Sequence, residues 1–233
     1  MRGRYLNSIR RLSSEPYDEA MSNAPAPVAG IVLAAGGGTR FGRPKALVES
    51  AEGTSWLANA VRSLLGGGCS PVIVVLGAAA DEAEALLERS FIHSGSVHVV
   101  RAEDWQTGMA ASLRRGLAAA SALDHEPESA SDSAPDAVAI VTVDVPSLGP
   151  AEVRRLIAPE PDAVGRETLR QASFSGRPGH PVVIGRDHWQ ALANSVTGDV
   201  GARPYLVAHG VRLVDCSDLG SGTDVDTPGD PAV

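Results

Sequence analysis

Cysteine is scarce in this chain, which contains only Cys69 and Cys216. The two lie far apart in the sequence, and neither has a C-x-x-C partner or a histidine at metal-ligand spacing. This pattern excludes a disulfide framework and argues against a structural zinc site. A reducing compartment suits such a sequence, so we expect a cytoplasmic protein.

Basic runs and long apolar runs are also missing. The formal net charge is -8, and Lys and Arg are scattered, which argues against a nucleic acid or an anionic membrane as a partner. No apolar stretch approaches the roughly 18 to 20 residues that span a bilayer, and no signal-peptide hydrophobic segment precedes the Pro-rich stretch near the N-terminus. We therefore expect no membrane partner and no export.

Aromatic residues make up only 4 % of the chain, so its core must consist mainly of Val, Leu, Ile and Ala. Short runs of these residues alternate with helical patterns. The predicted strands are 28–33, 72–76, 96–100 and 137–143, and the predicted helices are 55–65, 81–89 and 109–122. Strands that are apolar on both faces and separated by helices are typical of βαβ units, which predicts an α/β sandwich of three layers with a mostly parallel sheet.

Two segments have a composition unlike that of a core. Residues 1–27 combine scattered charges with prolines, which predicts a flexible N-terminal extension before a single domain of residues 28–233. Residues 124–136 are rich in Ser, Glu, Asp and Pro, which predicts a solvated loop between a helix and a strand.

A glycine-rich loop directly follows the first predicted strand. Residues 36–38 are all glycine, and Arg40 and Lys45 follow them at short spacing. Glycines let backbone N–H groups approach an anion closely, and the two cations add charge, so the loop is suited to cradle phosphates. It is not a P-loop, because Arg43 and Pro44 follow Gly42, and it is not a dinucleotide fingerprint, because Phe41 stands where Gly or Ala is needed.

A carboxylate stands at the end of a later strand, where Asp144 is followed by Pro146. An aspartate at the carboxyl end of a parallel strand lies where ligands bind, and its hard oxygens suit Mg²⁺. A turn-capping role is the alternative.

Further along, residues 108–112 begin a predicted helix and would present N–H groups or the Ser112 hydroxyl at its N-terminus, although Ser112 could also serve only as a cap. Met109 and Leu113, four residues apart, are expected in the core.

Six segments together resemble the MobA-like NTP transferase superfamily, and most closely its molybdenum cofactor cytidylyltransferases. Residues 33–45 match Leu-Ala-Ala-Gly-x-Gly-x-Arg-x-Gly-x-x-Lys at every fixed position, and residues 144–146 match Asp-x-Pro. Residues 108–117 are similar to Gly-Met-x-x-Ser-Leu-x-x-Gly-Leu, and residues 224–230 resemble Asp-Ile-Asp-Thr-Pro-Glu-Asp with Val for Ile and Gly for Glu. The last two segments are Gly-His-Pro-Val at 179–182 and Gly-Asp-x-Gly-Ala-Arg at 198–203.

The resemblance implies a Rossmann-like sheet of the nucleotide-diphospho-sugar transferase type and a role for each motif. Arg40, Lys45 and Asp144 would be catalytic, and Asp144 and Asp226 would hold Mg²⁺, with Asp224 as the alternative to Asp226 and an Asx turn or cap as the alternative role of either. The nucleotide-binding residues would be Leu33, Ala34, Ala35, Gly36, Gly37, Gly38, Arg40, Lys45, Gly108 and Ser112. Arg177, His180 and Asp199 would bind the acceptor, with Arg203 as an alternative to Asp199 and a structural role as the alternative for His180.

The implied activity is transfer of a nucleoside monophosphate from an NTP to a phosphorylated acceptor of the molybdopterin type. Leu-Ala-Ala-Gly at 33–36 favours CTP, because relatives that use GTP tend to carry Leu-Ala-Gly-Gly. A molybdoenzyme or its maturation factor is the implied protein partner. Two alternatives stay open: an NAD(P)H oxidoreductase of the nicotine-blue type, which occurs in the same subfamily, and a cofactor-handling partner of a molybdoenzyme without efficient turnover.

Overall fold

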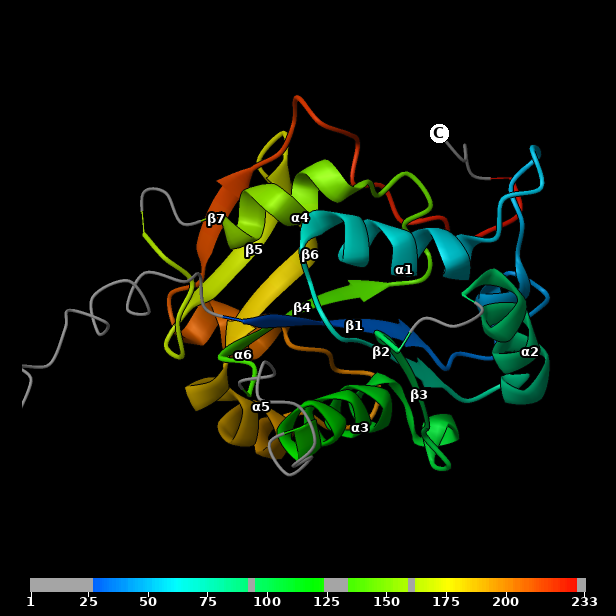
Figure 1. The fold of residues 1–233 in the computed structure, drawn as a ribbon, viewed down its shortest axis with the longest axis horizontal. Coiled ribbons are helices and arrows are strands. Elements are labelled where there is room, and N and C mark those ends of the chain that lie inside the picture. The colour runs from blue at the N-terminus through cyan, green and yellow to red at the C-terminus, as the bar shows by residue number, and fades with distance from the viewer. Residues whose placement is uncertain (1–26, 92–94, 124–133, 159–161, 230–233) are drawn as a thin grey trace, which may run out of the picture.

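One seven-stranded sheet forms the centre of the molecule (Figure 1). The structure, a computed structural model, describes residues 27–91, 95–123, 134–158 and 162–229. The strand order is β3-β2-β1-β4-β6-β5-β7. The strands are β1 (Val28–Ala34), β2 (Val72–Leu76), β3 (Val97–Arg101), β4 (Ala137–Thr142), β5 (Leu169–Phe174), β6 (Arg177–Gly185) and β7 (Arg212–Asp215).

The sheet is mostly parallel, as the sequence predicts. β1 pairs in parallel with β2 and with β4, β2 with β3, and β5 with β7, whereas β6 runs antiparallel to both of its neighbours. The exception arises from a tight hairpin between β5 and β6. Ser175 and Gly176 form its two-residue turn with φ of 50° and 76°, a left-handed pair that matches the twist of a hairpin.

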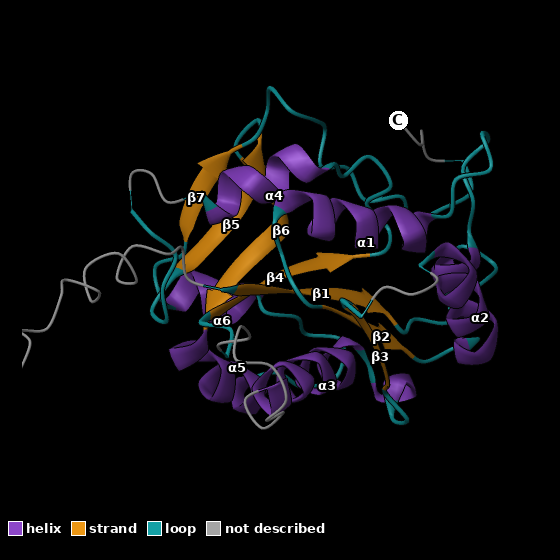
Figure 2. Cartoon of the chain, viewed as in Figure 1, coloured by secondary structure: helices purple, strands orange, loops and turns teal. Residues whose placement is uncertain are grey.

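Helices cover both faces of the sheet, so the predicted three-layer α/β/α sandwich is confirmed (Figure 2). One face carries α1 (Trp56–Gly67), α2 (Ala80–Ser90) and α4 (Pro150–Ile157), and the other carries α3 (Met109–Ala122), α5 (Trp189–Ser195) and α6 (Arg203–Ala208). Every residue of β2 is buried, and so are nearly all residues of β1 and β4, because helices pack on both sides of these strands.

Local signals explain where the helices begin and end. The Ser55 hydroxyl accepts a hydrogen bond from Ala58 N at 3.2 Å and caps α1, which ends at Gly68 with φ of 107°. At α4, Pro150 occupies the first turn, and the Glu152 carboxylate accepts a hydrogen bond from Gly149 N at 3.2 Å. On the other face, a Cβ at Gly116 would lie 2.9 Å from Ile31, so the missing side chain lets α3 pack closely on β1.

Two predicted segments lie largely outside the described residues. The predicted extension of residues 1–27 is described only at Pro27, and most of the predicted loop at 124–136 falls in the gap of residues 124–133. Among the helices that the structure describes, none combines the length and the apolar character needed to cross a membrane.

Candidate active site

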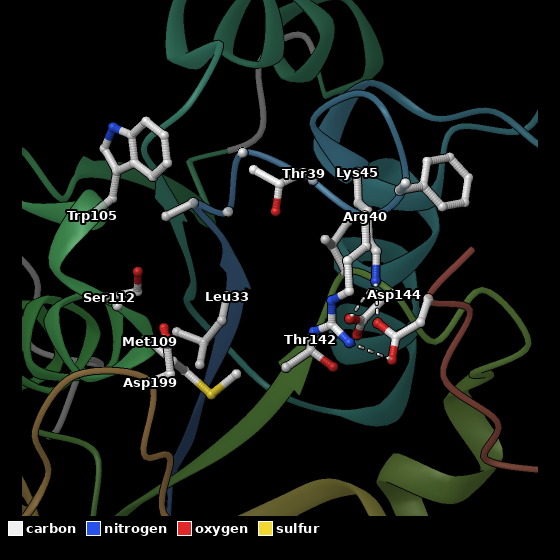
Figure 3. Close-up of a pocket in the computed structure, with 18 of the residues that line it drawn as sticks. Leu33, Thr39, Arg40, Lys45, Trp105, Met109, Ser112, Thr142, Asp144 and Asp199 are labelled. Carbon is white, nitrogen blue, oxygen red and sulfur yellow. Dashed lines mark hydrogen bonds and ion pairs between the residues drawn. The ribbon is translucent and has the colours of Figure 1, made fainter. Parts of the chain in front are cut away.

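A cavity of about 400 Å³ opens at the carboxyl ends of β1 and β4 (Figure 3). Its lining comes from five parts of the chain: the end of β1 with the loop that follows it, the segment that leads into α3, the end of β4 and two later loops. The lining residues are Leu33, Ala35, Gly36, Gly37, Gly38, Thr39, Arg40, Phe41, Lys45, Trp105, Gln106, Gly108, Met109, Ser112, Thr142, Val143, Asp144, Asp199 and Asp226. This is the edge of a parallel sheet at which ligands are expected.

The glycine loop is held in shape by its own backbone. Gly42 N donates to Gly38 O at 2.8 Å, and Ala78 N donates to Ala35 O at 2.9 Å. Gly38 has φ of 63°, and a Cβ at this position would lie 1.8 Å from Arg43 O. Only glycine fits there without moving the loop.

Lys45 connects the loop to the acidic side of the cavity. It begins the short 3-10 helix η2 (Lys45–Leu47), and its Nζ donates to Asp144 Oδ2 at 3.1 Å and to Asp226 Oδ1 at 3.0 Å. Arg40 Nη1 lies 3.7 Å from Asp226 Oδ2. The loop's two cations and the two carboxylates therefore form one ionic cluster (Figure 3).

The charge of Lys45 is favoured in this position. Burial disfavours the ammonium, since only 14 % of the side chain is exposed, but the charges of Asp144 and Asp226 and the hydrogen bonds to them outweigh burial. The net effect raises the pKa of Lys45 above its ordinary value of 10.5. The side chain is therefore a fixed cation at neutral pH.

Asp144 and Asp226 meet because a C-terminal segment returns to the end of β4. Val225 N donates to Asp144 O at 2.9 Å, and the Val225 side chain is buried in the core on the α1 face. Gly222 secures the approach of this segment, because a Cβ there would lie 2.1 Å from the ring of Phe174. The Asp-Val-Asp segment at 224–226 is thus held beside the Asp-x-Pro motif at 144–146.

The carboxylates suit a hard cation shared with a nucleotide. Within the described residues no three His, Cys, Asp or Glu side chains gather as a complete metal site. Asp144 and Asp226 would supply two oxygen ligands, and Mg²⁺ commonly takes one or two carboxylates and completes its shell with substrate phosphates and water. The donor set therefore fits Mg²⁺ bound together with a triphosphate.

Asp224, the alternative metal ligand, lies outside the cavity lining. Partial burial and the charge of Asp144 raise the pKa of Asp224, whereas His180 acts in the opposite direction. Asp226, not Asp224, receives the hydrogen bond from Lys45. The geometry therefore favours Asp226 beside Asp144.

The opposite side of the cavity is built around the N-terminus of α3. Trp105 belongs to the 3-10 helix η3 (Trp105–Thr107) and packs against the loop, where a Cβ at Gly37 would lie 3.2 Å from its ring. Ser112 is only 6 % exposed and lines the cavity. Leu113 is buried in the core as predicted. The prediction that Met109 is a core residue is wrong, because Met109 is 45 % exposed and lines the cavity beside Ser112.

The residues predicted for the acceptor separate in the structure. Asp199 lines the cavity together with the glycine loop. Arg177 and His180 lie on β6 outside the lining; Arg177 is exposed, and His180 Nδ1 lies 3.2 Å from Ile140 O. Ala34, predicted to bind nucleotide, is almost fully buried and does not line the cavity.

Several lining residues were not selected from the sequence. These are Thr39, Phe41, Trp105, Gln106, Thr142 and Val143. Thr39 and Phe41 occupy variable positions inside the glycine motif, and Thr142 and Val143 precede the Asp-x-Pro motif. Their proximity to a motif is the one signal that could have indicated them.

The MobA-like NTP transferase domain model matches residues 30–213, which include the glycine loop, α3 and the end of β4. The chain belongs to this family. Its relatives include the nicotine blue oxidoreductase of Paenarthrobacter nicotinovorans, which is 36 % identical over 210 residues, covering 86 % of this chain and 92 % of the relative.

Solved structures that are similar to this chain include Rv0371c from Mycobacterium tuberculosis H37Rv. It is 27 % identical, and the match covers 88 % of this chain and 95 % of that one with a TM-score of 0.63. A complex of Rv0371c with manganese matches with 26 % identity, 82 % and 89 % coverage and a TM-score of 0.60. The mostly parallel, Rossmann-like sheet of this chain therefore has the fold of these solved structures.

Proposed function

We propose that this MobA-like protein is a Mg²⁺-dependent nucleotidyltransferase that transfers CMP from CTP to a phosphorylated acceptor of the molybdopterin type and releases pyrophosphate. The observation that carries the proposal is the cluster of Lys45, Asp144 and Asp226 beside the glycine loop. A cation, two metal-binding carboxylates and a phosphate-cradling backbone are the groups that transfer between phosphates requires.

The chemistry would be an in-line displacement at the α-phosphorus of the nucleotide. An acceptor phosphate oxygen would form a bond to this phosphorus while the bond to the bridging oxygen of the β-phosphate breaks, and pyrophosphate would leave with the electron pair. Arg40, Lys45 and the amides of the loop would stabilise the charge on the phosphates. Mg²⁺ held by Asp144 and Asp226 would add charge neutralisation at the phosphate oxygens.

No nucleophilic or basic side chain is needed for this reaction, because a phosphate acceptor is already largely ionised at neutral pH. The protein's task is to position two anions that repel each other, and Arg40, Lys45 and the bound Mg²⁺ would offset part of this repulsion. The manganese bound by Rv0371c supports the use of a divalent ion by this chain.

The acceptor would approach from the side of β6. β6 pairs with β4, whose carboxyl end leads to Asp144, and His180 Nδ1 lies 3.2 Å from Ile140 O of β4. His180 could donate to an acceptor phosphate or pterin, and the exposed Arg177 could pair with a phosphate. The acceptor's identity and an association with a molybdoenzyme or its maturation factor rest on the sequence motifs.

CTP is the proposed donor because residues 33–36 read Leu-Ala-Ala-Gly, as in relatives that use this nucleotide. In the structure Leu33, Ala35 and Gly36 all line the cavity. The backbone of these residues would lie against the nucleoside, where a methyl group at Ala35 leaves less space than a glycine would.

A second candidate function is reduction of a nicotine-blue-type substrate with NAD(P)H. The 36 % identity to nicotine blue oxidoreductase over nearly the whole chain favours it. Against it, the glycine loop departs from the dinucleotide fingerprint at Phe41, and hydride transfer gives no role to the bridge that Lys45 makes between Asp144 and Asp226. The transferase explains more of the site.

Calorimetric titration separates the candidates. CTP, GTP, ATP and NADPH would each be titrated with and without Mg²⁺ into the wild type and into Asp144→Asn, which keeps the size of the side chain but removes its charge. We expect CTP to bind with Mg²⁺ and to bind at least about tenfold more weakly to Asp144→Asn. Tight NADPH binding that ignores both Mg²⁺ and the substitution, without NTP binding, would refute the transferase in favour of the reductase.

Release of pyrophosphate then distinguishes an enzyme from a binding partner. With CTP, Mg²⁺ and a molybdopterin-type acceptor, the wild type should release pyrophosphate, and Asp144→Asn should not. Binding of CTP without acceptor-dependent release would instead support a cofactor-handling partner of a molybdoenzyme.

A further inference from the structure

Asp199 is an exposed residue of the cavity lining, and its side chain has no partner among the described residues. It lines the cavity, yet it makes no hydrogen bond or ion pair with the part of the chain that the structure describes. The other two carboxylates of the lining, Asp144 and Asp226, are both paired with Lys45. Asp199 is thus available to a ligand.

The backbone, and not the aspartate side chain, holds this position. Gly198 O accepts a hydrogen bond from Ala110 N in the first turn of α3 at 2.9 Å, and Val200 N donates to Thr197 O at 3.1 Å to close the turn. Gly108 and Gly198 approach so closely that a Cβ at Gly108 would lie 2.3 Å from the Gly198 carbonyl carbon. The turn is therefore pinned to the N-terminus of α3 whatever side chain stands at position 199.

Asp199 lies at the end of the cavity away from the cations. Figure 3 shows it beside Met109 and Ser112, whereas Arg40 and Lys45 lie on the other side with Asp144. A phosphate would be repelled by an unpaired carboxylate, so the triphosphate belongs with the cations. The nucleoside would therefore occupy the end lined by Asp199.

A carboxylate offers acceptor oxygens alone, so a neutral ligand group that meets Asp199 must be a hydrogen-bond donor. A nucleoside offers neutral donors of two kinds, the ribose hydroxyls and the exocyclic amine of cytosine. Aspartate is known to accept from both kinds of group in other sites.

We propose that Asp199 is a specificity-determining residue that accepts a hydrogen bond from a neutral donor of the bound nucleoside. The inference rests on the proposed function, because it requires that a nucleotide binds in this cavity. The sequence motif predicts that Asp199 binds the acceptor, whereas this proposal assigns Asp199 to the nucleotide from which the CMP group is transferred. A binding site that uses such an acceptor group rejects analogues that lack the matching donor.

The test compares the dissociation constants of CTP, 2′-deoxy-CTP and UTP, all with Mg²⁺, for the wild type, Asp199→Ala and Asp199→Asn. The wild type should bind CTP at least about tenfold more tightly than one of the two analogues. Asp199→Ala should lose this preference and bind CTP about tenfold more weakly. Asp199→Asn should keep part of the preference, because its amide oxygen still accepts.

The direction of the change is diagnostic. If Asp199 had only an electrostatic effect on a polyanionic ligand, its removal would tighten the binding of all three nucleotides. Loss of the preference over 2′-deoxy-CTP would identify the 2′-hydroxyl as the donor, and loss of the preference over UTP would identify the amine. Unchanged ratios, or tighter binding by Asp199→Ala throughout, would overturn the inference.

Two controls keep the outcomes apart. The thermal unfolding midpoints of both variants should match that of the wild type, because the backbone holds the turn. If the wild type binds CTP in a Mg²⁺-dependent way and only the ratios fail to change, the inference about Asp199 is wrong and the proposed function stands. If the wild type binds none of the three nucleotides, the proposed function is wrong and the inference falls with it.

Discussion

Lys45 Nζ lies 3.1 Å from Asp144 Oδ2, although the two residues are 99 positions apart in the chain. The same nitrogen lies 3.0 Å from Asp226 Oδ1, so one ammonium holds together two carboxylates that would otherwise repel each other. The proposed metal would bind to these same two carboxylates. Lys45 and a divalent ion would therefore compete for them until a triphosphate offered Lys45 other anionic partners.

Replacing Lys45 by methionine should change metal and nucleotide binding in opposite directions. Without the competing ammonium, Mn²⁺ alone should bind about tenfold more tightly, whereas CTP with Mg²⁺ should bind at least about tenfold more weakly because a phosphate contact is lost. Calorimetry with each ligand measures both effects. Lys45→Arg, which keeps the charge, is the matched control, and a parallel loss of both affinities in Lys45→Met would contradict the competition.

The same substitution should reveal a pH-dependent contribution to stability. The pKa of Lys45 in the folded protein lies above its ordinary value of 10.5, so the ammonium stabilises the fold fully below that pH, and this contribution is lost as pH rises through the folded pKa. At pH 7 Lys45→Met should lower the free energy of unfolding by about 1–2 kcal/mol. Denaturant unfolding should show a constant difference from pH 6 to 9 and a smaller one above pH 10.5.

The first half of the fold could be predicted from the sequence because local and tertiary preferences agree there. Residues 72–76 are apolar and β-branched on both faces, so a strand buried between helices is the one arrangement that suits them, and β2 has these bounds. The strands predicted at 28–33 and 137–143 differ from β1 and β4 by one residue at one end, and the strand predicted at 96–100 differs from β3 by one residue at each end. Boundary shifts of this size reflect fraying at the ends of elements.

The second half of the fold was harder to predict from the sequence. β5 contains Arg170 and Gln171, which are buried because their polar ends reach backbone carbonyls: Arg170 donates to Leu156 O and Ala158 O, and Gln171 donates to Gly179 O. Such a strand lacks the apolar pattern of a buried one. The hairpin at Ser175 and Gly176 carries a weak turn signal, so the reversal of β6 was not predicted.

The site shows the same division. Residues within a motif and next to a strand end, such as Lys45 and Asp144, are brought together by the parallel sheet, which sequence reasoning can anticipate. Met109 was misplaced because its spacing from Leu113 indicates a helix face but does not show where the face leaves the core. The location of Asp199 depends on a loop pinned by Gly108 and Gly198, a contact between distant segments that no local pattern contains.

Gly38→Ala should destroy the glycine loop, whereas Gly36→Ala should not. An alanine at position 38 would be forced into a left-handed conformation, with its Cβ 1.8 Å from Arg43 O, while a Cβ at Gly36 meets nothing within 4 Å. We expect Gly38→Ala to lose more than about 2 kcal/mol of stability and all measurable nucleotide binding. Thermal unfolding of both variants tests this. Equal midpoints would show that the loop adapts.

Gly222→Ala should weaken Mg²⁺-dependent binding of CTP although it removes no proposed ligand. The added Cβ would lie 2.1 Å from the Phe174 ring, so the segment that carries Asp226 would have to move away from Asp144. We expect about a tenfold increase in the dissociation constant of CTP in Mg²⁺. Gly229→Ala, whose Cβ would meet nothing within 4 Å, is the control and should bind CTP as the wild type does. An unaffected Gly222→Ala would mean that Asp226 is not held by this segment.

Nucleotide binding should change the fluorescence of Trp105 and leave that of the other two tryptophans unaltered. Trp56 and Trp189 are 4 % and 3 % exposed and lie in the two cores, whereas Trp105 lines the cavity and packs over Gly37 of the loop. A base or phosphate that enters the cavity displaces water from the indole of Trp105 alone. Titration of CTP with Mg²⁺ should therefore shift the emission of the wild type and of Trp189→Phe, but not that of Trp105→Phe.

A full signal in Trp105→Phe would place the nucleotide elsewhere or show that binding rearranges the core around Trp56. Calorimetry on Trp105→Phe separates the two, because the first leaves the affinity for CTP unchanged, and it also shows whether the indole itself contributes to that affinity.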